Sequence, residues 1–445
     1  MLRLATLAVA LLAGSVPLPS PVTTAAPPRV ESVTPAGQRL GYLRLSGSDT
    51  RFVPRGANYV RLAEFDQDGQ AVQFHSTFEP GIYDAGRADG TLAALHHDGY
   101  NTVRVFIDPG SIPAAQAGHP HGLGRGVGDN SPIYAPYLDN VADFVRRSGG
   151  YGIYVQFSLD AFPQNNFYYS LVGPVDATQI DGNNLFYLHP GMHRAKAAYL
   201  TNFVSALHDR IGDAGMPAVL AYATDNEAFV VGDKAPFSRA GGLVNTAAGT
   251  YDMADPAGRQ QAQDANLVAY ARAMTDAVHA ADPLAMVTMG AFTYHAVGKP
   301  GPQGLPIRCD TNCRPDVDYR YPVRLSMLTQ FANLSYVDLH IYPDGTAGSL
   351  DRNLTSIEWA TVRGPVILGE YGAFKAFYAT DITRAAYAMR DLQIATCRAG
   401  IIGWLFWTWD TTETADQRRL FTLTDSAGAI NGQLAPIARP DPCRL

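Results

Sequence analysis

The sequence has few cysteines, no long apolar run after its first residues and no excess of positive charge. It holds four cysteines in 445 residues, and no segment after Val30 contains 18 uncharged apolar residues. A later membrane span is not expected, because such a helix needs about 20 apolar residues. Acidic residues outnumber basic residues, 41 to 34. This balance argues against a surface that neutralises the phosphates of nucleic acids or anionic lipids.

The composition is that of a folded protein with a large core. Hydrophobic residues make up 47% of the chain, charged residues 17% and aromatic residues 10%. Such values exclude extended disorder for most of the chain. A length of 445 residues fits either three average domains or one large barrel. No internal repeat or change of composition follows Val30, so we predict one folded domain.

The first 26 residues have the pattern of a secretory signal peptide. Arg3 precedes an apolar run from Leu4 to Ala13, and small residues follow as far as Ala26. The apolar run is too short to cross a bilayer as a stop-transfer helix. An uncleaved anchor or tether is the alternative. We therefore expect a secreted protein with a signal peptide at 1–26, a Pro- and Ala-rich linker at 27–39 and a folded domain at 40–445.

The four cysteines fit an oxidising compartment. Cys309 and Cys313 lie in a polar loop and are close enough in sequence to form a disulfide. Cys397 and Cys443 then form a second possible pair. A zinc site is the alternative, but the chain lacks paired CxxC motifs or histidines at metal spacing. We predict disulfides and no metal site.

Short apolar runs rich in β-branched residues alternate with longer amphipathic stretches, which is typical of βα units on a parallel sheet. Eight such runs occur, at Phe52–Tyr59, Thr102–Ile107, Ile153–Leu159, Ala218–Thr224, Ala285–Ala291, Tyr336–Ile341, Val366–Glu370 and Ile401–Trp407. Helices are expected between them at Thr91–His97, Tyr137–Ser148, His193–Ile211, Gln261–Ala281, Leu350–Ala360 and Arg384–Ala399. Eight strands with crossover helices predict an α/β fold, a (β/α)8 TIM barrel.

An open doubly wound sheet is the alternative fold. It would carry a glycine-rich phosphate turn after its first strand, and Arg55-Gly56-Ala57-Asn58 is not such a turn. Ahead of the first strand, Gly41–Ser46 and Arg51–Pro54 flank a Ser-Gly-Ser-Asp turn. This pattern predicts an N-terminal hairpin that closes the bottom of the barrel. Enlarged βα loops are expected after the first four strands.

Two strands end in glutamate. Glu227 follows the fourth strand, and Glu370 ends the seventh. The two strands lie on roughly opposite sides of an eight-stranded barrel, and barrel sites form at the C-terminal ends of strands. Either glutamate alone could form a strand-end salt bridge. A facing pair instead matches glycosidic bond cleavage, which needs a proton donor for the leaving oxygen and an anion beside the reacting carbon.

Several short segments together resemble a known family. They are Asn226-Glu227, Gly369-Glu370-Tyr371-Gly372, Arg55-Gly56-Ala57-Asn58, Asn101-Thr102-Val103-Arg104, His340-Ile341-Tyr342 and the segment from Trp404 to Trp409. Their order and spacing, from about Leu40 to Asp410, resemble the retaining glycoside hydrolases of clan A, particularly the cellulase-like glycoside hydrolase family 5. The resemblance implies that Glu227 is the acid/base and Glu370 the nucleophile, with a covalent glycosyl-enzyme intermediate. It implies no metal and no organic cofactor.

Arg104, at the end of the second strand, is expected to point its guanidinium at Glu370. The alternative is a buried structural arginine. A nearby positive charge lowers the pKa of a carboxyl group. We therefore predict a lowered pKa for Glu370 and a raised pKa for Glu227.

Three further substrate-binding residues follow from the resemblance. Asn226 resembles the clan's asparagine that binds the sugar 2-hydroxyl. His340 and Tyr342 resemble the pair in which the histidine borders the acid/base and the tyrosine borders the nucleophile. Their HxY spacing places both side chains on one face of a strand. A lone histidine near an apolar strand would otherwise be a satisfied core residue.

Trp407 is predicted to be the platform on which the reacting sugar stacks, because an aromatic face packs on the apolar C–H face of a pyranose. It matches the family's tryptophan on the eighth strand. Trp404 and Trp409 are expected to be packing residues. Aromatic residues in the loops above the barrel are either further sugar sites or loop anchors: Phe162, Phe167, Tyr168, Tyr169, Tyr294, Tyr319 and Tyr321.

One position departs from the family. The family usually has a histidine at the end of strand three, where this chain runs Gln156-Phe157-Ser158-Leu159-Asp160-Ala161. Asp160 or Gln156 is expected to take over part of its hydrogen bonding. The departure leaves the subfamily, and therefore the sugar, undecided.

The resulting hypothesis is a monomeric, retaining β-glycosidase that acts on a carbohydrate, with β-mannan or β-glucan as the substrate. An exo-acting β-glycosidase on oligosaccharides or glycoconjugates is the nearest alternative, since the loops Pro109–Pro136 and Pro163–Pro190 could close one end of a groove. A barrel that binds carbohydrate without cleaving it is the second alternative. A binding protein has no use for a paired acid and anion, which argues against it.

Overall fold

The computed structural model describes residues 27–60, 77–110, 122–124, 130–302, 314, 316–410, 415–424 and 428–445. The expected signal peptide at 1–26 and the expected Cys309–Cys313 disulfide lie outside these residues. Within the described ranges, every helix is either too short or too polar to cross a membrane.

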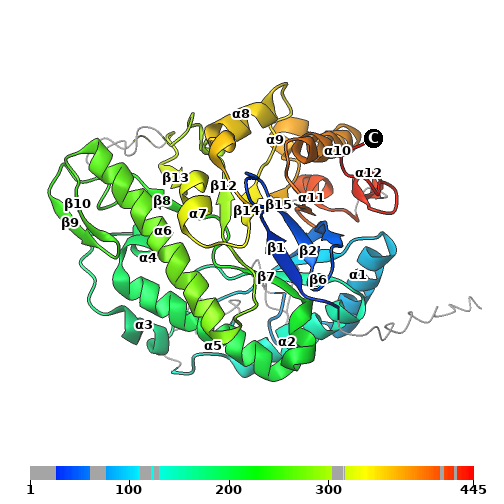
Figure 1. Cartoon of the computed structure of the whole chain (residues 1–445), viewed down its shortest axis with the longest axis horizontal. Helices are drawn as coiled ribbons and strands as arrows, with labels where there is room; N and C mark the ends of the chain where they lie inside the picture. The colour runs from blue at the N-terminus through cyan, green and yellow to red at the C-terminus, as the bar shows by residue number, and fades with distance from the viewer. Residues whose placement is uncertain are drawn as a thin grey trace, which may run out of the picture.

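Nine parallel strands form one sheet, in the order β11-β7-β6-β5-β4-β16-β15-β14-β12. β11 and β12 are separated by Met289 alone, so they are two halves of one strand. β11 pairs with β7, and β12 pairs with β14, which closes the sheet into an eight-stranded barrel. Helices surround this barrel (Figure 1). The predicted (β/α)8 TIM barrel is therefore confirmed.

The barrel strands correspond to the eight apolar runs, with bounds that differ by a few residues. They are β4 (Arg55–Tyr59), β5 (Thr102–Phe106), β6 (Tyr154–Ser158), β7 (Val219–Ala223), β11 (Val287–Thr288), β12 (Gly290–Phe292), β14 (Val337–His340), β15 (Val366–Tyr371) and β16 (Trp404–Phe406). Every residue in them is buried. Parallel strands are covered on both faces, which explains why the runs are continuously apolar.

Two strand predictions were wrong in detail. Phe52 belongs to β3 (Arg51–Phe52), outside the barrel, because Pro54 separates it from β4 and a proline has no N–H for a ladder. The fifth strand is interrupted because the chain after β7 crosses it there. Gly290 donates its N–H to the Asp225 carbonyl oxygen (3.0 Å), and a Cβ on Gly290 would lie 1.7 Å from the Asn226 carbonyl oxygen.

The expected helices are present and extend beyond their predicted starts. They are α1 (Ala85–His97), α2 (Ala135–Gly150), α5 (Pro190–Gly215), α6 (Pro256–Ala281), α8 (Ser349–Ser356) and α10 (Ile382–Arg398). Asp84, Asp255 and Asp381 cap three of them by accepting backbone N–H groups of the first turn. Shorter helices occur in the loops: α3 (Asn166–Val172), α4 (Asn184–Leu188), α7 (Leu325–Phe331), α9 (Lys375–Tyr378), α11 (Ala415–Phe421) and α12 (Asn431–Leu434).

An antiparallel sheet of β1 (Val30–Val33), β2 (Tyr42–Leu45) and β3 lies across the bottom of the barrel (Figure 1). Leu43 and Phe52 pack against residues from inside the barrel, among them Leu405. The predicted hairpin that closes the barrel is therefore present. The prediction that 27–39 is a linker was wrong, because β1 pairs along its whole length with β2 and adds a third strand to this sheet.

The polypeptide around the C-terminus is fastened to the barrel. Cys397, at the end of α10, forms the predicted disulfide with Cys443. The buried guanidinium of Arg55 donates to the Arg439 and Leu434 carbonyl oxygens at 2.5 Å each. The last residues are therefore attached both to α10 and to the first barrel strand.

Long loops rise from the C-terminal ends of the strands. The loop after β6 carries α3 and α4, and the loop after β7 carries β8 (Phe229–Val231), β9 (Leu243–Thr246) and β10 (Gly249–Asp252). β8 pairs with β13 (Arg320–Pro322), which follows the fifth barrel strand. This two-stranded sheet holds Arg320 beside the loop that carries Glu227.

Candidate active site

The two predicted catalytic carboxylates face one another at the C-terminal end of the barrel. Glu227 lies in the loop after β7 with 26% of its side chain exposed, and Glu370 on β15 is 6% exposed. Ligand atoms of Glu227, His340 and Glu370 all lie within 4.8 Å of one another. One oxygen of each glutamate can therefore reach the same bond of a bound molecule.

A β-bulge at Gly369 turns Glu370 into the barrel. His340 of β14 pairs with Glu370, whereas the preceding Leu339 pairs with Leu368, so Gly369 is an extra residue. Val366 and Leu368 face the surrounding helices and Ile367 faces the interior. Strict alternation would therefore point Glu370 outward. The bulge re-aims it, as bulges next to active sites commonly do. Asn58 of β4 donates its amide to the Gly369 carbonyl oxygen (2.9 Å) and holds the bulge in place.

Arg104 is the centre of a hydrogen-bond network in the floor of the site, and its contact with Glu370 is the predicted one. Its Nη1 donates to Glu370 Oε1 (2.7 Å) and to Asn58 Oδ1 (2.9 Å). Its Nη2 donates to Asn226 Oδ1 (2.8 Å). Its Nε donates to Asp338 Oδ2 (3.2 Å). One buried guanidinium thus holds both the nucleophile candidate and the Oδ1 end of the Asn226 amide.

Asp338 is a buried carboxylate that the sequence did not single out. It lies two residues before His340, on the inner face of β14, and is fully buried. Gln156 Nε2 donates to its Oδ2 (2.5 Å), and Tyr336 donates to Gln156 Oε1 (2.8 Å). Gln156 is therefore part of the network, as expected, whereas Asp160 is exposed and accepts the N–H of Ala161. Alternation along the strand places Asp338 on the same face as His340, but this signal is shared by other buried strand positions and did not single Asp338 out.

His340 and Tyr342 lie beside the carboxylates in the predicted arrangement. His340 Nδ1 lies 2.9 Å from Glu227 Oε1 and 3.6 Å from Glu370 Oε2. Its Nε2 lies 3.5 Å from Asp338 Oδ1. Tyr342 donates its hydroxyl to Glu370 Oε2 (2.8 Å). The histidine thus borders the acid/base candidate, and the tyrosine borders the nucleophile candidate.

The pKa values of these groups reflect burial and charge together. Burial alone would lower the pKa of His340, but Glu370, Asp338 and Glu227 raise it to about 10. At neutral pH both ring nitrogens therefore carry protons, and Nδ1 donates to Glu227. This protonated imidazole is also a poor metal ligand, because a metal needs the neutral ring.

The predicted order of the two glutamate pKa values was wrong for the site without substrate. Burial raises the pKa of Glu370, and the charges of His340 and Arg104 offset only part of that effect. Burial also acts on Glu227, but the hydrogen bond and charge of His340 bring its pKa below the usual value. The reason is that His340 donates a hydrogen bond to Glu227, whereas the positive charge of Arg104 acts on both Glu370 and Asp338.

His340 gives the protein a testable dependence of stability on pH. Its pKa is about 10 in the folded protein, above the unfolded value of about 6.5. Its contribution is therefore complete below pH 6.5 and is lost as pH rises through 10. We expect the free energy of unfolding, measured with urea, to fall over this window. His340 contributes a slope of at most about 1.4 kcal/mol per pH unit. His340→Gln should have a shallower dependence, and equal slopes in both proteins would contradict a charged His340.

Trp407 directly follows β16, whereas the sequence predicts it as the last residue of the eighth strand. It contacts Phe106 edge to face (ring centroids 5.7 Å apart) and packs with Val60 and Phe421. The predicted inward position of Trp407 is therefore present. Trp404 faces outward and donates its ring N–H to Thr396 of α10 (2.9 Å), and Trp409 is buried in the core. Both are packing residues, as expected.

The aromatic residues expected in the upper loops are mostly packing residues. Phe162, Tyr168, Tyr294 and Tyr321 are buried in the outer core. None of the seven residues considered lines the cavity that opens beside Glu227. That cavity has a volume of about 480 Å³, a size common for small-molecule sites, and its aromatic residues are Phe292, Tyr342, Phe374 and Phe377.

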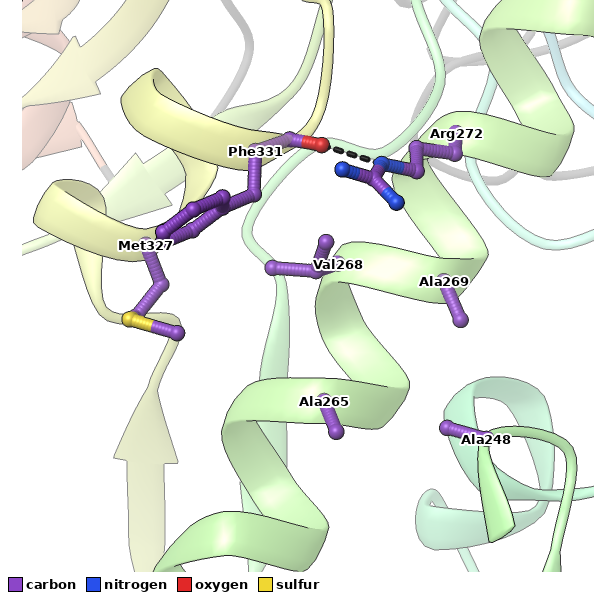
Figure 2. Close-up of a pocket in the computed structure, with 7 residues that line it drawn as sticks. All are labelled: Ala248, Ala265, Val268, Ala269, Arg272, Met327 and Phe331. Carbon is purple, nitrogen blue, oxygen red and sulfur yellow. Dashed lines mark hydrogen bonds between the residues drawn. The ribbon is translucent and has the colours of Figure 1, made fainter.

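A second cavity differs in character from the cavity beside Glu227. It is a groove between α6 and α7, lined mainly by small and apolar side chains such as Ala265, Val268 and Met327 (Figure 2). Arg272 at its edge donates to the Phe331 carbonyl oxygen. Its described lining residues include no carboxylate and no nucleophile.

No protein-family model matches the sequence, and no curated protein matches it either. Solved structures do share its fold. An exo-β-1,4-mannosidase from Opitutaceae bacterium strain TAV5 is 17% identical with a TM-score of 0.55, and the match covers 88% of this chain. This chain spans 59% of that enzyme's length.

Two further structures match over more of their own length. An endo-1,4-β-mannanase from Rhizomucor miehei is 12% identical with a TM-score of 0.52, covering 92% of this chain and 99% of that one. An endo-β-1,4-mannanase from Thermotoga petrophila is 14% identical with a TM-score of 0.52, covering 90% and 79%. These neighbours share the barrel fold of this chain.

Proposed function

We propose that this protein is a retaining β-glycosidase in which Glu370 is the nucleophile and Glu227 the acid/base. One observation carries the proposal: ligand atoms of the two carboxylates lie within 4.8 Å of one another. Retaining glycosidases have carboxyl groups about 5–5.5 Å apart, whereas inverting enzymes need about 6.5–9.5 Å to admit a water molecule. A carbohydrate-binding protein without activity would not need this facing pair of carboxylates.

In the first step Glu370 attacks the anomeric carbon and Glu227 gives a proton to the glycosidic oxygen. The carbon–oxygen bond breaks, the alcohol leaves, and a glycosyl ester with Glu370 forms. Arg104 and Tyr342 each hold one oxygen of Glu370 by hydrogen bonds of 2.7 and 2.8 Å. They fix the direction of attack and stabilise the carboxylate that leaves again in the second step.

In the second step Glu227, now ionised, removes a proton from a water molecule, and the water oxygen replaces Glu370 at the anomeric carbon. The sugar leaves with its original configuration. Loss of the negative charge on Glu370 in the ester lowers the pKa of Glu227, since the two carboxylates otherwise repel one another. The same residue can thus act first as an acid and then as a base.

Glu227 must take up a proton when the substrate binds, because the pKa of Glu227 in the free site is lowered. About a quarter of its side chain is exposed to water. A sugar placed over it removes that water, and desolvation of a carboxylate raises its pKa. We infer that a bound substrate covers Glu227 and thereby reverses the order of the Glu227 and Glu370 pKa values.

The sugar that remains on the enzyme is placed between Asn226 and Trp407. The Asn226 NH2 group suits the 2-hydroxyl, a contact that strengthens in the transition state. Trp407 offers an apolar face to the sugar ring. Because the neighbours in fold include enzymes named for β-1,4-mannosidic activity, β-mannosides are the first substrates to test, followed by β-glucosides. The pattern of residues 1–26 supports a secreted protein that acts outside the cell.

A substrate panel tests this proposal directly. The protein is incubated with β-mannan, β-1,4-glucan, β-1,3-glucan and aryl and alkyl β-glycosides, and release of reducing ends or of the alcohol is measured. We expect release from at least one class, and proton NMR of the first product should give the β-anomer. Inactivity over the whole panel would contradict the enzyme function, whereas an α-anomer would contradict the retaining mechanism alone.

A further inference from the structure

The cavity of about 480 Å³ meets the active site on the side of the acid/base candidate. Glu227, His340 and Tyr342 form its inner end. Asn226 and Trp407, which we assign to the retained sugar, are not among its lining residues. Glu227 gives its proton to the oxygen that joins the sugar to the leaving group. A group that lies beyond this oxygen, in the cavity, is therefore the leaving group.

The polar side chains of the outer cavity wall are already paired within the protein. Arg320 makes a two-pronged contact with Asp318, with its shortest hydrogen bond at 2.7 Å. Asp344 accepts hydrogen bonds from Thr346 (2.6 Å) and Arg352 (2.9 Å) and lies 3.6 Å from His295. A sugar in this position would need hydrogen-bonding groups for its hydroxyls, and most of the groups that Arg320 and Asp344 offer are engaged within the protein.

Asn353, deeper in the same wall, is paired as well. Its Oδ1 accepts from Thr293 (2.6 Å), and its Nδ2 donates to the Ser349 carbonyl oxygen (2.8 Å). The polar side chains of this cavity therefore bond mainly within the protein and leave few hydrogen-bonding groups for a polar ligand. Leaving the hydroxyls of a bound sugar without partners in a cavity would weaken its binding.

Aromatic rings line the remaining wall and continue outward from the reacting centre. Tyr342, which touches Glu370, contacts Phe374 at 4.8 Å between ring centroids, and Phe374 contacts Phe377 at 6.4 Å. Phe374 and Phe377 are 36% and 41% exposed. Ala296 and Ala376 add small apolar surfaces. The available ligand surface is thus a row of exposed rings that begins at the nucleophile candidate.

We infer that this cavity binds the leaving group and that it takes an apolar aglycone, either aryl or alkyl, in place of a further sugar. Burial of apolar surface against Phe374 and Phe377 supplies the binding energy, with no hydrogen bond required. The inference rests on the proposed glycosidase function and narrows it to glycosides of apolar alcohols.

The test compares leaving groups on a constant sugar. Methyl, octyl and 2-phenylethyl β-glycosides have alcohols of similar acidity, so differences in kcat/KM report contacts of the aglycone. A β-1,4-linked disaccharide and trisaccharide of the same sugar supply a sugar leaving group. Every compound is measured in two forms, with mannose and with glucose as the sugar. We expect kcat/KM of the octyl or the phenylethyl glycoside to exceed that of the methyl glycoside and of both oligosaccharides by about tenfold or more. A preference for octyl over phenylethyl would identify an alkyl leaving group, and the reverse preference an aryl one.

Phe377→Ala provides the matched variant, and Phe331→Ala its control. Both rings are about equally exposed, at 41% and 42%, but Phe331 lies in the groove between α6 and α7. Phe377→Ala should reduce the ratio of octyl to methyl turnover at least about fivefold, whereas Phe331→Ala should leave it unchanged. Thermal unfolding of both variants monitors folding.

Two outcomes overturn the inference, and they can be told apart from failure of the function. Preference for the oligosaccharides, or an octyl to methyl ratio that Phe377→Ala does not change, would overturn the apolar leaving-group site while leaving a glycosidase. No hydrolysis of any glycoside would overturn the glycosidase function on which the inference rests.

Discussion

Replacing Glu370 by alanine should reduce kcat/KM by about 10⁴–10⁶-fold, the range found when a covalent nucleophile is removed. The variant keeps the acid/base but has no atom to form the glycosyl ester. Arg104 loses one of its two carboxylate partners, so an anion of small size should be attracted to the vacated space. Added azide should therefore restore turnover of an activated aryl glycoside and give a glycosyl azide of inverted configuration, which NMR identifies.

The control for this experiment is Glu31→Ala, which removes a half-exposed glutamate from β1 at the opposite end of the barrel. It should retain full activity. Activity in Glu370→Ala close to that of the unchanged protein, or azide products that keep the original configuration, would contradict the assignment of the nucleophile.

Replacing Gly369 by alanine should disable the site even though Gly369 touches no substrate. A Cβ at this bulge would lie 1.5 Å from Asp338 Oδ1. Asp338 must then leave its place, which breaks its contacts with Arg104 and Gln156. Loss of one partner from a buried ion pair costs about 3–5 kcal/mol. We expect that loss in urea unfolding, and a decrease of activity of at least about 100-fold from misplacement of Arg104 and Glu370.

Gly90→Ala is the matched control, because Gly90 lies inside α1 and a Cβ there has no atom within 4 Å. It should stabilise the protein slightly, by up to about 1 kcal/mol. The double variant Gly369→Ala with Asp338→Ala removes the clash but leaves Arg104 without that carboxylate. It should recover part of the stability and none of the activity. A single variant Gly369→Ala that is as stable and active as the unchanged protein would contradict the role of the bulge.

The fold could be predicted because its signal is local and repeated. Continuous apolar runs arise from strands buried on both faces, and they recur eight times with helices between them. The places where prediction failed are those where distant residues decide. The fifth strand breaks because the Asn226 carbonyl oxygen reaches Gly290, a contact between residues 64 positions apart. The strand β1 was missed because its Pro- and Ala-rich surroundings hide a short segment that pairs with β2.

The candidate site was partly predictable for a similar reason. Residues at strand ends converge in a barrel, so Glu227, Glu370, Arg104 and His340 could be expected together. Asp338 could not be ranked above other buried positions, because its meaning depends on Gly369 leaving room for it. The pKa order also failed for a reason absent from the sequence: His340 donates to Glu227, and Asp338 shares the charge of Arg104.

The break in the fifth strand anchors the loop that carries Glu227. Gly290 of β12 pairs with Asp338 of β14 on one edge. On its other edge, Gly290 donates its N–H to the Asp225 carbonyl oxygen and accepts the N–H of Ala228, at 3.0 Å each. Glu227 lies between these two loop residues, so one glycine of the barrel wall holds the backbone on both sides of it. A displacement of Gly290 should therefore be transmitted directly to Glu227, whereas Glu370 stands on a strand that is paired along both edges.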